Sequence, residues 1–203
     1  MAEKRSRGEV RHSKLQKVAA ELFLRHGYEG VSIDQIVELA GGSKSTVYSE
    51  FGGKSGLFIS SIENLCRQAN EPLANIDYTG LNLEQSLKKL SYHILKFITA
   101  KRSVEMHRLA IGESLNTPEV GRAWYTYGPA RTASFIRSVL ERHLNELRNT
   151  TVPIDRLAVL LHDSLTGDVL YRLLAGISKQ PKDAELKRLA STTVDVILGQ
   201  VRP

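Results

Sequence analysis

Apolar residues recur at helical spacing along almost the whole chain. Near the N-terminus they fall at positions i, i+3, i+4, i+7 and i+8, which is the stripe of an amphipathic helix: Leu15, Val18, Ala19, Leu22 and Phe23. Gly27 ends this stripe. We find neither an alternating strand pattern nor an internal repeat, so the chain is predicted to be all-α.

The next segment predicts two short helices joined by a tight turn. Ser32 is a good N-cap, and Gln35 three residues later completes a capping box. The pair Gly41-Gly42 ends the first of these helices, because glycine tolerates the left-handed conformation of a helix stop. Ser43 can cap the second at once.

This second short helix has few apolar residues. Val47 and Phe51 are its large apolar side chains, and the following polar or amphipathic residues are left pointing outward: Lys44, Ser45, Thr46, Tyr48 and Ser49. A helix this short is marginal in water, so neighbouring helices must hold it. Its outer face of donors and one cation suits the major groove of DNA.

Residues 15–58 resemble the DNA-binding domain of the TetR family of bacterial transcriptional regulators. The matching positions keep the family spacing without a gap and include Ala19, Leu22, Phe23, Gly27, Tyr28, Ile36, Ala40, Gly41, Ser43, Lys44, Thr46, Tyr48, Phe51, Lys54 and Leu57. The resemblance implies that four side chains face base edges or nearby phosphates: Lys44, Ser45, Thr46 and Ser49. It also implies phosphate contacts from Tyr48, Lys54 and Ser32.

Two positions depart from the family pattern. Gly42 stands where the family usually has valine, so the turn lacks a small apolar plug. Glu50 stands where histidine or tyrosine is common. Its carboxylate either turns away from DNA, because phosphates would repel it, or accepts from the amino group of a cytosine.

The remainder of the chain continues as helix after helix, giving about nine in all. A fourth helix is predicted over 54–68 and a link over 70–80, where Pro, Gly and Asn gather. Gly128-Pro129 should break or kink the chain. The predicted organisation is a helix-turn-helix domain over 1–56 and a larger helical domain for effector binding and dimerisation over 57–203.

Residues 106–131 are similar to the C-terminal domain of AcrR- or AefR-like members of the same family. The similarity rests on an acidic residue and a proline-started helix that ends in aromatic residues before Gly-Pro: Glu113, Pro118, Trp124, Tyr125, Gly128 and Pro129. It implies a domain that binds a small molecule and dimerises through the last two long helices, about 155–175 and 182–200.

Aromatic, Met and His residues are the candidates for lining an effector pocket. They are Tyr92, Phe97, Met106, His107, Trp124, Tyr125, Tyr127 and His162. Plain core packing is the alternative for each of them. Buried Tyr and Trp also carry donors that an apolar ligand with one polar end could use.

Composition and charge agree with a DNA-binding protein. The 203 residues are 41% hydrophobic and 25% charged, with a formal net charge of +6. Basic residues crowd the N-terminal region, either as a solvated tail or as an arm along the DNA: Lys4, Arg5, Arg7, Arg11, Lys14, Lys17 and Arg25. There is neither a membrane-length apolar run nor a signal peptide, so a cytoplasmic protein is expected.

Enzyme and cofactor chemistry find little support in the sequence. We find no phosphate-binding glycine loop, no metalloprotease motif and no paired thiols, so no catalytic residue, cofactor or metal is predicted. The single cysteine, Cys66, lies in an apolar helical pattern and is expected in the core. His162-Asp163 is too short a match to indicate a metallohydrolase.

The expected function is therefore sequence-specific transcriptional regulation. The chain would act as a homodimeric repressor, released from a palindromic DNA operator by a small molecule. Two alternatives stay open: a metal-responsive regulator with ligands among Glu105, His107, Glu113 and His162, and a constitutive architectural DNA binder.

Overall fold

The computed structural model describes residues 7–147 and 150–199, and these residues form helices joined by turns, with no strand among them. This confirms the predicted all-α fold. Within the same ranges, no helix combines the length and apolarity that crossing a membrane requires. Lys4 and Arg5 of the predicted basic arm lie outside the described residues.

Packing divides the chain into two units. Of the described residues, those within 1–67 and 105–127 form the first unit, and those within 68–104 and 128–203 form the second. The predicted division at residue 56 concerns function and stays a prediction, whereas packing groups residues 105–127 with the N-terminal helices.

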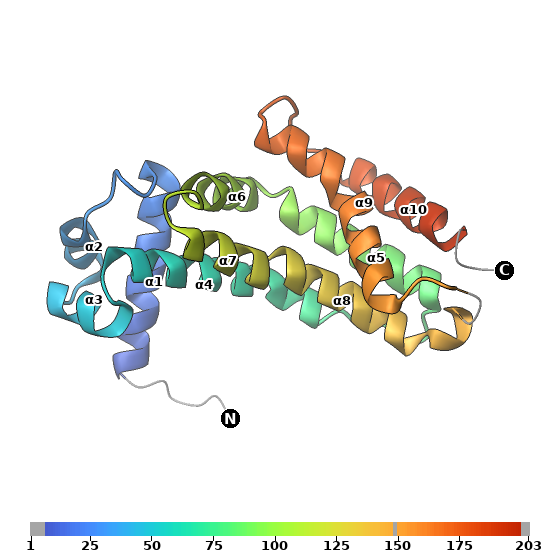
Figure 1. Ribbon diagram of the computed structural model, residues 1–203, viewed down its shortest axis with the longest axis horizontal. Coiled ribbons are helices and arrows are strands. Elements are labelled where there is room, and N and C mark those ends of the chain that lie inside the picture. The colour runs from blue at the N-terminus through green and yellow to red at the C-terminus, as the bar shows by residue number, and fades with distance from the viewer. Residues whose placement is uncertain (1–6, 148–149, 200–203) are drawn as a thin grey trace. The chain divides into compact units, whose positions relative to one another are not determined.

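The first unit surrounds a core of aromatic and aliphatic side chains. Its helices are α1 (Arg7–His26), α2 (Ile33–Ala40), α3 (Lys44–Phe51), the first part of α4 (Lys54–Ala74), most of α6 (Lys101–Glu113) and α7 (Pro118–Tyr127) (Figure 1). Phe23 of α1 meets Phe58 of α4 edge to face, with ring centroids 4.8 Å apart. Both rings are almost fully buried, and Cys66 is buried in the same core, as expected.

The helix-turn-helix segment forms as its sequence predicts. The Ser32 hydroxyl accepts from the backbone N–H of Gln35 at 3.2 Å, and the Gln35 side chain accepts from the N–H of Ser32 at 2.8 Å. The capping box is therefore confirmed. Gly41 and Gly42 have φ values of 73° and 120°, a region that favours glycine. Ser43 then caps α3 by accepting from the N–H of Thr46 at 3.2 Å.

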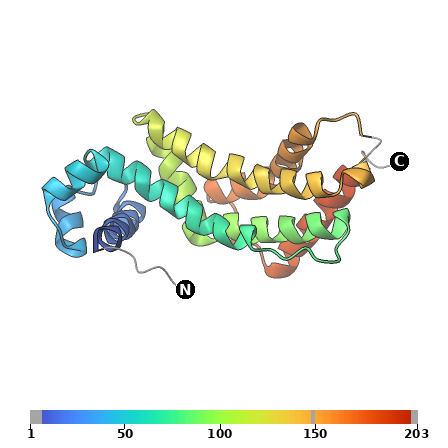
Figure 2. The same cartoon turned by 90° about the horizontal axis from the view of Figure 1, so that it is seen from below.

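The second unit is a bundle built on α5 (Leu83–Ile98). Around it lie the end of α4, α8 (Pro129–Arg142), a 3-10 turn (Leu144–Leu147), α9 (Ile154–Leu174) and α10 (Asp183–Gly199). Figure 2 shows α8 running beside α5, and α10 also packs on α5. The apolar stripe of α5 fills the centre, where Leu83, Leu90 and Ile94 are fully buried.

Two predicted boundaries can be compared with the structure, and one of them differs. The break at Gly128-Pro129 is confirmed, because α7 ends at Tyr127 and α8 starts at Pro129. The link predicted over 70–80 is wrong at its start, since α4 continues through Pro72 to Ala74. Leu73 lies in the second core with 2% exposure, and this burial favours the extra helical turn despite the proline.

Candidate nucleic-acid interface

Helix α3 is held by its inner face and presents its polar face outward. Val47 is fully buried in the first core, which also contains Leu15 and Ala19 of α1. Of the predicted DNA-contacting residues of α3, Thr46 is half-buried. The other four are exposed: Lys44, Ser45, Tyr48 and Ser49. The core therefore supports an eight-residue helix that would be unstable by itself.

Hydroxyl groups gather at the N-terminal end of α3. The Oγ atoms of Ser43 and Ser45 lie 2.7 Å apart, and Oγ1 of Thr46 lies 3.1 Å from Ser43 Oγ. The Ser49 hydroxyl donates to the backbone carbonyl of Thr46 at 3.2 Å. A helix N-terminus with several hydroxyls favours a phosphate or an acceptor on a base edge.

Lys44 forms an ion pair within the helix-turn-helix segment. Its Nζ lies 2.7 Å from Oδ1 of Asp34, near the start of α2. The hydrogen bond to Asp34 raises the pKa of the Lys44 ammonium, which stays charged. Both side chains are more than 60% exposed, so the pair adds little stability and can open when a better acceptor arrives.

The three residues expected to hold phosphates lie in the same unit. Tyr48 is 59% exposed. A Cβ atom at Gly53 would stand 3.3 Å from the Tyr48 ring, so glycine leaves room for that ring position. Lys54 begins α4 and places its Nζ 4.3 Å from the centre of the Tyr28 ring. Ser32 caps α2 and also approaches the Gln35 side chain, with oxygens 3.2 Å apart.

Glu50 is bound to a residue that the sequence did not single out. Its Oε2 lies 3.0 Å from Nδ1 of His12 on α1. The His12 ring also stacks on Phe51, with centroids 4.4 Å apart and planes 29° from parallel. The sequence offers one hint of this contact: Glu50 and Phe51 follow the buried Val47 at i+3 and i+4, so they lie on the side of α3 nearest its neighbours.

The predicted effector-pocket residues are divided between the two units. Met106, His107, Trp124 and Tyr127 belong to the first unit, together with Tyr125, which is 59% exposed. In a separate set, Tyr92, Phe97 and His162 belong to the second unit. Their spacing in the sequence could not show this division, because both sets lie on amphipathic helices.

His107 and Trp124 form a buried polar pair in the first unit. The indole N–H of Trp124 donates to Nδ1 of His107 at 2.7 Å, and the two rings meet at 89°. Burial lowers the pKa of His107 to about 4, so the ring is neutral at pH 7. Among the described residues, Nε2 of His107 has no hydrogen-bond partner.

The candidates in the second unit have their own partners. The Tyr92 hydroxyl donates to a carboxylate oxygen of Asp183 at the start of α10. Nδ1 of His162 lies 2.9 Å from Oδ1 of Asp163. Phe97 is partly buried against the second core.

A metal centre finds no support in the described residues. No three His, Cys, Asp or Glu side chains in residues 7–147 and 150–199 gather as a ligand set. Glu105, His107 and Glu113 lie on α6 but do not form such a set. His162 belongs to the other unit.

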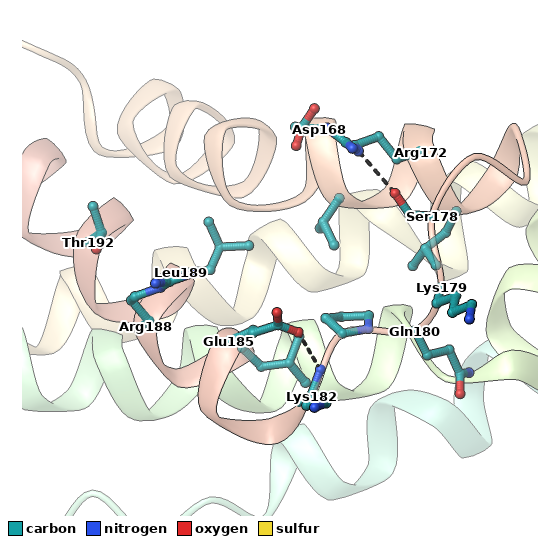
Figure 3. Close-up of a pocket in the computed structure, with 14 residues that line it drawn as sticks. Asp168, Arg172, Ser178, Lys179, Gln180, Lys182, Glu185, Arg188, Leu189 and Thr192 are labelled. Atoms are coloured by element: carbon teal, nitrogen blue, oxygen red, sulfur yellow. Dashed lines mark hydrogen bonds between the residues drawn. The ribbon is translucent and has the colours of Figure 1, made fainter.

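A groove of about 880 Å³ runs between α9, the following loop and α10 (Figure 3). It is lined by the apolar side chains of Val169, Leu173, Leu186 and Leu189 and by charged side chains: Asp168, Arg172, Lys179, Lys182, Glu185 and Arg188. Arg172 donates from Nε to Ser178 at 3.0 Å, and the backbone N–H of Lys182 donates to Glu185 at 2.7 Å. The volume falls within the roughly 300–1,000 Å³ typical of small-molecule sites.

Comparisons with known proteins agree with this arrangement. Residues 15–60 match the family of bacterial regulatory proteins called the tetR family, and residues 85–200 match the C-terminal domain of AefR-like transcriptional repressors. The repressor AcnR of Corynebacterium glutamicum is 26% identical over 185 residues, covering 91% of this chain and 88% of AcnR. The repressor NicS of Pseudomonas putida is 29% identical over 99 residues, which span 45% of this chain and 47% of NicS.

A solved structure shows the same fold. A crystal structure described as a TetR-family regulator from Mesorhizobium loti superposes with a TM-score of 0.79 at 24% identity, covering 98% of this chain and 100% of the other. The fold and the exposed α3 define a helix-turn-helix DNA-binding protein. The chain belongs to the TetR family of bacterial transcriptional regulators.

Proposed function

We propose that this protein is a repressor that binds a palindromic operator as a homodimer and leaves it when a small molecule binds. The observation that carries the proposal is α3 itself. It is capped by Ser43, anchored by buried Val47, and polar on its outer face. Those are the features of a helix that enters the major groove and reads base edges.

The DNA contacts divide into two kinds. Lys44, Ser45, Thr46 and Ser49 reach base edges or nearby phosphates from α3. Tyr48, Lys54 and Ser32 hold phosphates, and so fix the register of the helix on the duplex without reading sequence. The net charge of +6 supports a polyanionic partner.

Dimerisation occurs through α9 and α10. Both helices expose apolar side chains in the single chain: Leu160 and Tyr171 on α9 are 37% and 71% exposed, and Val196 on α10 is 60% exposed. A two-fold dimer covers these residues and places two recognition helices roughly 34–36 Å apart, about one turn of DNA.

The effector acts through the C-terminal part of the chain. Its pocket draws on the predicted residues around His107 and Trp124 or those around Tyr92, Phe97 and His162. Helix α4 contributes Ile62 to the first core and Leu73 to the second, which supports its role in coupling the two. A coupling free energy of about 1–3 kcal/mol weakens DNA binding roughly 5- to 150-fold.

The cytoplasm is the expected location, because the operator lies there, and no catalytic role is proposed. Selection of bound sequences from a random duplex library, with purified full chain and no added ligand, tests the function. Enrichment of an inverted repeat with fixed spacing supports a dimeric, operator-binding regulator. If the protein is shown to be free of small molecules and still enriches nothing, the proposal fails.

A further inference from the structure

The inner face of α3 has two anchor points one helical turn apart. Val47 is fully buried in the core, Phe51 at i+4 is half-buried against it, and Glu50 at i+3 is exposed beside them. Val47 fixes the first part of this eight-residue helix, and Phe51, which packs partly buried against the same core, fixes its end. A contact that holds Phe51 in place therefore limits the tilt of α3.

His12 supplies this second anchor with two contacts from one ring. It stacks on Phe51 with centroids 4.4 Å apart, and its Nδ1 lies 3.0 Å from Oε2 of Glu50. The ring plane and the nitrogen restrict α3 in different directions, because stacking limits separation whereas the hydrogen bond limits rotation.

The part of α1 that carries His12 is itself fixed. Leu15 is fully buried one turn later. Gln16 donates to the Ser60 hydroxyl of α4 at 2.6 Å, and the Ser61 hydroxyl donates to the backbone carbonyl of Gln16 at 3.3 Å. His12 therefore projects from a segment that is tied to α4.

We infer that His12 is a positioning residue for DNA recognition, which sets the orientation of α3 through Glu50 and Phe51. Glu50 consequently binds His12 and does not read a cytosine. This inference rests on the proposed role of α3 in reading DNA. Base-edge hydrogen bonds need good distance and angle, so a small tilt of α3 weakens several of them together.

The test compares full-length variants on the duplex that the wild-type protein enriches from a random library. His12→Ala is expected to weaken binding about tenfold while keeping the same preferred bases and an unchanged melting temperature. His12→Phe keeps the stacking and His12→Gln keeps a donor for Glu50, so each recovers part of the loss. In the His12→Ala background, Glu50→Ala adds little.

His26→Ala is the matched control, because His26 is an exposed histidine at the other end of α1. It is expected to bind like the wild type. Wild-type affinity in His12→Ala overturns the inference. A loss of one base preference in Glu50→Ala also overturns it, because Glu50 then reads that base.

Hydrogen exchange separates this inference from the proposed function. In the DNA-free protein, amides of α3 in His12→Ala are expected to exchange about tenfold faster, with α2 unchanged. Unchanged exchange in α3 overturns the positioning role whatever the DNA results. Faster exchange without any DNA binding by the wild type leaves the anchor in place and refutes the proposed function instead.

Discussion

Trp124 donates its indole N–H to Nδ1 of His107 across 2.7 Å and thereby fixes the tautomer of a buried imidazole. Because Nδ1 accepts, the proton of the neutral ring resides on Nε2. The bond joins α6 to α7 within the first unit. Protonation of His107 would make Nδ1 a donor and would place two donors against each other.

Stability should fall as the pH falls from about 6.5 to about 4. The pKa of His107 is lowered from 6.5 to about 4 by burial, so over that range the unfolded chain binds a proton that the folded chain does not. This pKa shift corresponds to a loss of roughly 3 kcal/mol in the free energy of unfolding. Urea unfolding of the wild type and His107→Gln at pH 7 and pH 4.5 measures it.

The glutamine amide can still accept from Trp124 but does not titrate. His107→Gln is therefore expected to lose less stability between the two pH values than the wild type. His26→Gln should behave like the wild type, since His26 is exposed. Equal losses in all three proteins would show that His107 does not cause the pH dependence.

Lys54→Ala should weaken binding to every duplex by a similar factor. Lys54 begins α4, and its ammonium group lies over the Tyr28 ring. A contact from this group to a phosphate does not depend on the base sequence. The slope of log K against log salt concentration should become shallower by about one. Fluorescence anisotropy at several salt concentrations measures it, with Lys179→Ala of the second unit as the control. A loss of affinity confined to one duplex sequence would contradict the phosphate role of Lys54.

Lys44→Ala should change base preference, in contrast to Lys54→Ala. In the free protein Lys44 forms an ion pair with Asp34. Breaking this pair costs free energy, which weakens DNA binding. Asp34→Asn should therefore strengthen binding about threefold, and this gain should vanish in the Lys44→Ala background. Competition binding with duplexes that differ at single base pairs tests both effects. An equal loss on all duplexes for Lys44→Ala would place Lys44 on phosphates.

Gly42→Val should destabilise the protein by about 1–3 kcal/mol, although valine is the usual family residue here. Gly42 has φ of 120°, which a β-branched residue rarely adopts. A Cβ atom would meet only the side chain of Arg11 at 4.0 Å, so the cost lies in the backbone and not in a clash. Chemical denaturation measures the change. A variant as stable as the wild type would mean that the turn adopts another conformation.

The Cys66 thiol should be inert in the folded protein. It is 1% exposed and lies 3.7 Å from the Met106 sulfur, and burial raises its pKa to about 12. A thiol reagent at pH 8 should label it at least about 100-fold more slowly in the native protein than in urea, because reaction needs an exposed thiolate. Rapid labelling of native protein would contradict this burial.

Much of the local structure follows from short stretches of sequence. The capping box at Ser32, the glycine turn before Ser43 and the break at Gly128-Pro129 each depend on residues a few positions apart. Local hydrogen bonds and backbone preferences decide such features, so the sequence predicts them well. The end of α4 was missed because burial of Leu73, a distant packing effect, outweighs the local influence of Pro72.

The sequence by itself determined an all-α protein with a capped recognition helix and the family to which it belongs. Only the tertiary structure decided that His12 contacts Glu50 and Phe51, that Asp34 holds Lys44, and that Trp124 bonds to His107. It also decided that the predicted pocket residues belong to two units. The reason is physical: helical periodicity shows which face of a helix is apolar, but the partner of each side chain depends on how separate helices pack.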